Sequence, residues 1–103
     1  MNIPVKEVIF AASSDMTFNG EYKEVWLLVY KDKLITLKVD NNNDYIHLTD
    51  ITQYNMKNIK NITYNHYVTG GTLVGEIDGE ITQIIRFTAT YKDKFGLVVK
   101  LLN

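Results

Sequence analysis

The sequence predicts a small, mostly β domain that ends in one α-helix. Isoleucine, valine and threonine account for 30 of the 103 residues and twelve more are aromatic, and these side chains fit a pleated, half-buried sheet. Apolar and polar residues alternate over most of the chain, and a helical spacing replaces this alternation near its end. We therefore expect one domain over residues 1–103, with seven antiparallel strands within residues 5–89 and a helix over about 90–102.

The first four strands are separated by short polar segments that are typical of turns. The strands are expected over residues 5–12, 22–30, 34–39 and 45–49. The segments between them are Ser13-Ser14-Asp15 with the polar stretch that follows, Lys31-Asp32-Lys33, and residues 40–44. Because residues 22–30 are apolar on both faces, this strand is expected at the centre of the sheet, with Trp26 as a structural residue.

The alternation also predicts which side chains of the third and fourth strands face the core. The side chains expected to point inward are Ile35, Leu37, Val39, Ile46 and Leu48. The side chains expected to point to solvent are Thr36 and Lys38.

The middle of the chain is less regular. Residues 50–58 fit either the end of a strand or one helical turn, because Ile51 and Met56 suit both. A fifth strand is expected over residues 59–68, and the spacing of Ile59 and Ile62 predicts a bulge because it breaks the alternation.

The last two strands are expected to form a hairpin over residues 72–77 and 80–89, after a turn at Gly70-Gly71. Asp78-Gly79 is a strong hairpin signal, because a type I′ turn needs positive φ at both central residues. The residues of the returning strand expected on one side are Ile81, Ile85, Phe87 and Ala89.

The final segment has a helical period. Its apolar stripe consists of Tyr91, Phe95, Val98, Val99 and Leu102. Gly96 within it costs a helix about 1 kcal/mol relative to alanine, so we expect the helix backbone to approach the sheet closely there.

Composition excludes several classes of protein. The net charge of −1 and the pI near 6.1 argue against a general nucleic-acid binder, and the absence of cysteine excludes thiolate chemistry and disulfides. The longest apolar run, residues 25–30, is too short to span a membrane, and Lys6 and Glu7 interrupt any secretory signal. Ten lysines to one arginine and ten asparagines indicate an A/T-rich, bacterial genome. We expect a cytoplasmic domain.

Three stretches resemble the pleckstrin-homology (PH) superfold in its bacterial, GRAM-like form. Residues 24–37 (EVWLLVYKDKLITL) are similar to its second and third strands, and residues 45–52 (YIHLTDIT) resemble an I-x-L-x-D-I run in its fourth strand, with His47 where proline is frequent. Residues 84–102 resemble its last strand and capping helix. The resemblance implies a PH-like split β-barrel of two nearly orthogonal sheets, with the helix plugging one open corner.

Members of that superfold that bind inositol phosphates hold the headgroup among the loops between strands 1 and 2, 3 and 4, and 6 and 7. In this chain those loops form an acidic mouth with Asp15, Glu21, Asp40, Asp44 and Asp78. Lys23 is the only nearby base, so we do not expect phosphoinositide or membrane binding. These acidic residues could bind a basic segment of a partner or coordinate a hard cation such as Ca²⁺. The structural alternative is that they only keep the loops exposed to solvent.

Catalytic groups are sparse. His47 and His66 fall in separate strands, and Ser13 and Ser14 have no nucleophile motif around them. Residues 70–75 lack the lysine of a phosphate-binding loop. We therefore expect no enzyme activity, no metal and no cofactor.

The predicted fifth strand offers a candidate interaction surface, because its free edge is expected beside the helix. The resemblance implies that an extended peptide adds there as a further strand. The candidate partner-binding residues are Tyr64, Asn65, His66, Tyr67 and Val68. The alternative interpretation is that these tyrosines have only a structural role and pack partly on the sheet.

The leading hypothesis is a non-catalytic PH-like module for protein interaction, regulation or localisation, which docks a protein partner or self-associates into a homo-oligomer. Because the predicted core extends to Leu102, the chain is also interpreted as a domain of a longer protein. The alternative is a small-molecule or lipid-binding module that uses the barrel mouth. A weak hydrolase or isomerase would need a cluster of groups around His47 or His66.

Overall fold

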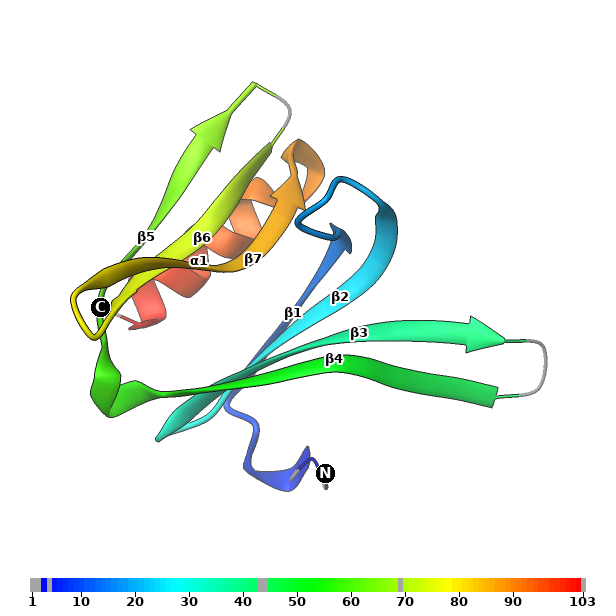
Figure 1. Ribbon diagram of the computed structural model, residues 1–103, viewed down its shortest axis with the longest axis horizontal. Helices are drawn as coiled ribbons and strands as arrows, with labels where there is room; N and C mark the ends of the chain where they lie inside the picture. Colours follow the sequence, from blue (N-terminus) through cyan, green and yellow to red (C-terminus); the bar gives the residue numbers. More distant parts are fainter. Residues whose placement is uncertain (1–2, 4, 43–44, 69, 103) are drawn as a thin grey trace.

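The computed structural model describes residues 3, 5–42, 45–68 and 70–102. Within them it contains seven strands in one antiparallel sheet and one C-terminal α-helix, as the sequence predicts (Figure 1). The strands are β1 (Phe10–Met16), β2 (Tyr22–Val29), β3 (Lys33–Asn42), β4 (Tyr45–Asn55), β5 (Ile59–Tyr67), β6 (Gly70–Ile77) and β7 (Glu80–Thr88). The helix is α1 (Lys92–Leu102), and the 3-10 helices are η1 (Val5–Glu7), η2 (Met56–Asn58) and η3 (Ala89–Tyr91).

The sheet is open and bent. Its strand order is β4-β3-β2-β1-β7-β6-β5, which leaves β4 and β5 at the two edges. β1 and β7 share a single register pair, Met16 with Arg86, so the sheet bends there into one part with β1–β4 and another with β5–β7 (Figure 1). The closed split barrel implied by the resemblance is therefore not confirmed, because β4 and β5 follow each other in the chain through η2 but do not pair.

The β1–β7 junction is held by side chains that were expected to end the first strand. Ser14 is buried, and its hydroxyl donates to the carbonyl oxygen of Arg86. The Asp15 carboxylate accepts from the Thr88 hydroxyl at 2.8 Å and from the Thr88 backbone N–H at 3.4 Å. The prediction of a strand over residues 5–12 is therefore wrong in its bounds. β1 ends later because β7 satisfies these polar groups, and it begins later because Val5–Glu7 form η1.

The main core lies between the sheet and α1. The Phe95 ring of the helix stacks on Phe87 of β7 with centroids 4.6 Å apart, and Tyr64 of β5 meets Phe87 edge-on at 6.1 Å. The predicted stripe is confirmed, since Phe95 and Val98 are fully buried and the other members of the stripe pack against them. Each such buried apolar side chain contributes roughly 1.5–3 kcal/mol to stability.

A second hydrophobic cluster lies on the outer face of β2 and β3. It contains Tyr30, Ile35 and Leu37, and the N-terminal residues Ile3 and Val8 pack against it. The central position of β2 is confirmed, because one of its faces packs in each cluster.

The orientation of β3 differs from the prediction. Thr36 pairs with Leu27, and Lys38 pairs with Val25. Directly paired residues share a face of the sheet, so Thr36 and Lys38 lie on the side of the main core and not on the solvent side. Thr36 is buried as a result.

β4 is longer than expected. It runs on to Asn55 and is followed by η2, so residues 50–58 contain both of the expected alternatives. Asp50, with φ of 51°, lies at a register shift that re-aims the strand. Ile46 and Leu48 are exposed and not inward-facing, because the far part of the β3–β4 hairpin extends beyond the body of the protein (Figure 1).

The remaining strands confirm the predicted bulge and the predicted hairpin and correct one predicted turn. The bulge in β5 and the Asp78-Gly79 hairpin are confirmed, with φ of 52° at Asn61 and of 53° and 82° at Asp78 and Gly79. Gly70-Gly71 is not a turn but the start of β6, where a side chain on Gly71 would lie 2.6 Å from the carbonyl oxygen of Asn65.

β7 carries a register shift opposite Leu73 and Val74, and this shift changes which of its residues are buried. Ile84 and Ile85 are both buried, together with Phe87. Ile81 and Ala89 were expected on the same side as Phe87, but both are exposed.

We predict that Gly96→Ala stabilises the protein. The added methyl group would lie 3.8 Å from the Tyr64 hydroxyl oxygen, an ordinary contact, so the close approach expected from the sequence does not require glycine. Urea unfolding should show a gain of about 0.5–1 kcal/mol from helix propensity. Gly71→Ala is the control and should lose about 1–3 kcal/mol through overpacking. A loss at Gly96 would contradict the prediction.

We predict that Tyr30→Phe also stabilises the protein. Tyr30 is 3% exposed, and its hydroxyl has no hydrogen-bond partner among the residues with described positions. Removing this unpartnered group should raise the unfolding free energy by about 1–2 kcal/mol at pH 7, measured by urea denaturation. Tyr22→Phe is the matched control, because Tyr22 is 77% exposed and should show almost no change.

The same variant tests the pH dependence. Burial, and then the Glu7 carboxylate, raise the pKa of Tyr30 above its usual value near 10.0. The unfolded chain therefore loses this proton first, and Tyr30 makes stability fall as pH rises above about 10. Tyr30→Phe should reduce that fall, and an unchanged slope above pH 10 would contradict the account.

Candidate functional site

The acidic residues of the expected mouth lie on different parts of the fold. Asp15 lies in β1, Glu21 precedes β2, Asp40 lies in β3 and Asp78 lies in the β6–β7 turn, whereas Asp44 is outside the described residues. The β6–β7 turn and the far end of the β3–β4 hairpin lie at opposite sides of the molecule (Figure 1). The structure therefore does not gather these four carboxylates.

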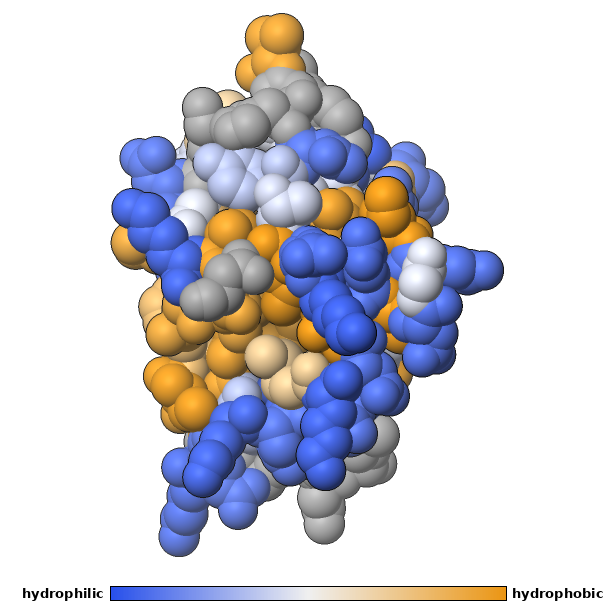
Figure 2. All heavy atoms as spheres, turned by 90° about the vertical axis from the view of Figure 1, so that its left-hand side faces the viewer, coloured by the Kyte–Doolittle hydropathy of each residue, from blue (hydrophilic) through white to orange (hydrophobic). Residues whose placement is uncertain are grey.

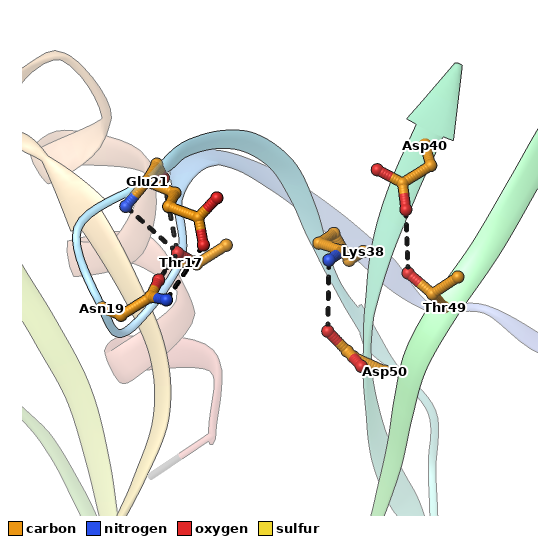
Figure 3. A network of polar contacts seen from close by, with 7 residues as sticks. All are labelled: Thr17, Asn19, Glu21, Lys38, Asp40, Thr49 and Asp50. Carbon is orange, nitrogen blue, oxygen red and sulfur yellow. Dashed lines mark hydrogen bonds and ion pairs between the residues drawn. The ribbon is translucent and has the colours of Figure 1, made fainter. Parts of the chain in front are cut away.

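Each of these acids has a local environment of its own. Asp15 bonds Thr88 at the β1–β7 junction. Glu21 accepts from the Asn19 side chain at 2.9 Å in the β1–β2 loop, where Thr17 also bonds Asn19 (Figure 3).

The other two acids face different neighbours. Asp40 accepts from the Thr49 hydroxyl at 3.4 Å across the β3–β4 hairpin (Figure 3). Asp78 shares a surface hollow with Lys57 and Lys60, so it lies beside opposite charge. Over residues 3, 5–42, 45–68 and 70–102, no group of three histidine or acidic side chains is placed to hold a metal ion.

The fifth-strand candidates do lie at a sheet edge. Tyr64, Asn65, His66 and Tyr67 belong to β5, and Val68 follows it. Tyr64 is half-buried against Phe87, whereas Asn65 and Val68 are exposed. For His66 and Tyr67 the structure gives the backbone, which pairs with the first two residues of β6.

Helix α1 lies beside β5, and Gly96 faces the Tyr64 hydroxyl. Figure 2 shows the end of the molecule that carries the β6–β7 turn and the C-terminal part of α1, with an apolar patch at its centre bordered by hydrophilic side chains. On α1, Leu97 and Leu101 are 58% and 50% exposed. The edge of β5 is thus accompanied by α1, whose exposed face carries these two leucines.

A cleft of about 260 Å³ lies where the open sheet bends, and the sequence did not lead us to it. It is lined by Met16, Thr17, Phe18, Val25, Thr36, Leu37, Lys38, Asp50, Thr52, Tyr54, Ile84, Ile85 and Arg86. β2, β3 and β4 form one wall and β7 forms the other. The tight turn between β2 and β3 sets the register that places Lys38 beside Val25, and this pairing decides which face of the sheet Lys38 is on.

The cleft has an apolar floor and charged groups at its rim. Lys38 Nζ lies 3.4 Å from the Asp50 carboxylate, and this ion pair joins β3 to β4 within the hairpin (Figure 3). Arg86, the only arginine of the chain, donates from Nη1 to the Phe18 carbonyl oxygen at 3.0 Å. Burial raises the pKa of Tyr54 above its usual value near 10.0.

No family model, no curated protein and no solved structure matches this chain. In the described part of the chain, no helix has the length and apolar character needed to cross a membrane.

Proposed function

We propose that this protein is a non-catalytic interaction module of the PH-like type, which recognises an extended peptide segment by adding it to the edge of β5. The observation that carries the proposal is the position of β5 at the end of the sheet, with α1 beside it. An edge strand offers main-chain groups to a further strand, and neighbouring apolar surface adds specificity.

The PH-like assignment has support from topology. Four antiparallel strands are followed by three more that join the first strand through β7, and a helix ends the chain and packs against the second group. The single register pair between β1 and β7 divides the sheet into the two groups that a split barrel would have.

Two features favour β5 over β4 as the recognition edge. β5 has the helix beside it, whereas the outer part of the β3–β4 hairpin extends away from the body (Figure 1). The exposed leucines of α1, Leu97 and Leu101, add apolar area near this end of the molecule. A partner segment comes from another protein or from a second copy of this chain, and its role is regulatory or localising.

The two histidines support a non-catalytic role. His47 belongs to β4 and His66 to β5, the two opposite edges of the sheet. An acid–base or metal site built from both histidines needs the two side chains within reach of one another, and the strand order separates them.

We predict that a peptide selected from a random decamer library perturbs the backbone amides of β5 and α1 in heteronuclear NMR spectra. Strand addition uses every second peptide N–H of the ligand. Two versions of the peptide, N-methylated at odd or at even positions, should therefore differ, with one losing at least about tenfold in affinity and the other retaining it.

Asn65→Lys and Gln53→Lys form a matched pair, because each replaces an exposed amide on an edge strand, β5 and β4 respectively. The first should alter peptide affinity and the second should not. Equal tolerance of both N-methylated peptides, or shifts confined to β4, would overturn the proposal. Light scattering over a concentration series distinguishes a second copy from a separate partner.

A further inference from the structure

We propose that the cleft at the bend of the sheet binds a small amphipathic carboxylate, with its apolar body on the cleft floor and its carboxylate on Lys38. This site lies between β7 and β2–β4 and is separate from the β5 edge. Its volume of about 260 Å³ is just below the usual range of roughly 300–1,000 Å³ for ligand sites, which favours a small ligand.

Lys38 occupies a position in the sheet where a charged side chain is unusual. Register pairing with Val25 puts this lysine on the core side of β3, where a sheet normally carries apolar residues. Its side chain is only 25% exposed. A charged group on this face that lines a cavity is suited to receive an opposite charge there.

The present partner of Lys38, the Asp50 carboxylate, is replaceable by a ligand. The Asp50 side chain is 76% exposed, and an ion pair of this kind contributes little to stability. A ligand carboxylate inside the cleft would be less hydrated than Asp50 and would form a stronger charge-assisted contact with the lysine. Binding therefore exchanges a weak ion pair for a better one.

The net charge of the cleft lining favours a ligand with one negative charge. The charged residues that line the cleft are Lys38, Arg86 and Asp50, which gives one net positive charge. Arg86 bonds the Phe18 carbonyl oxygen through one N–H, and a guanidinium has further donors. A monoanion fits this balance better than a cation or a dianion.

The floor of the cleft is mostly apolar. Ile84 and Ile85 are each 1% exposed overall and form the β7 wall, and Val25 and Tyr54 lie opposite on β2 and β4. Thr36 and Thr52, which pair across β3 and β4, add hydroxyl groups to the lining. Apolar walls with a few polar groups at defined positions are typical of small-molecule sites.

The test is a titration of the full chain with sodium octanoate, followed by NMR. We expect saturable shifts of the amides of Val25, Thr36 and Ile85. Octanol should bind at least about tenfold more weakly, since it has the apolar body without the charge, and octylammonium should not bind. Octanoate without saturable shifts up to millimolar concentration would overturn the proposal.

Variants separate the charge from the cavity. Lys38→Met should lower the affinity for octanoate by about tenfold and leave the affinity for octanol unchanged. Lys33→Met is the matched control, because Lys33 lies on the same strand but on the face of Tyr30, over whose ring its Nζ sits at 5.0 Å. An equal loss of octanoate affinity in both variants would contradict the assignment of the ligand carboxylate to Lys38.

Thr52→Trp tests the cavity itself. Thr52 is exposed at the rim, so a larger side chain there should block octanoate and octanol together without disturbing the core. Unchanged binding of octanoate in this variant would place the ligand elsewhere and overturn the proposal. Peptide binding at β5 is expected to survive Thr52→Trp, so the two proposals fail independently.

Discussion

A polar junction between β1 and β7 sets how the two parts of the sheet are arranged. One register pair, Met16 with Arg86, joins two groups of strands that otherwise pair only among themselves. Side-chain bonds strengthen this connection, because Ser14 donates to the Arg86 carbonyl and Asp15 accepts twice from Thr88. Hydrogen bonds with a charged partner are stronger than neutral ones, so a short junction can hold a large bend.

The surfaces with functional meaning follow from this bend. Because the sheet turns without closing, β4 and β5 both remain edges, and a cleft stays open between β7 and β2–β4. α1 fills the concave side of β5–β7 by stacking Phe95 on Phe87, whereas the N-terminal residues cover the outer cluster around Tyr30. Peptide addition and ligand binding are therefore assigned to different places.

The sequence predicted the seven strands and the helix because their periods are local properties of the chain. It also predicted the β5 bulge and the Asp78-Gly79 turn, which depend on a few neighbouring residues. The sequence did not predict the features that depend on contacts with residues far away in the chain. Ser14 and Asp15 were expected in a turn, because their hydrogen-bond partners lie in β7, far away in the sequence. Gly70-Gly71 was expected in a turn as well, because its close packing with Phe87 also depends on a distant strand. For the candidate sites, the β5 edge could be predicted from strand order, but the cleft could not, because Thr36 and Lys38 were assigned to the wrong face.

A double-mutant cycle between Asp15 and Thr88 tests the role of the junction most directly. The free energies of unfolding of the wild type, Asp15→Ala, Thr88→Ala and the double variant would be measured by urea denaturation. We expect a coupling energy of about 1 kcal/mol or more, because the two residues share a 2.8 Å charge-assisted hydrogen bond in a half-buried position. Additivity within about 0.3 kcal/mol would show that the two halves of the sheet are held together by other means, and would contradict this expectation.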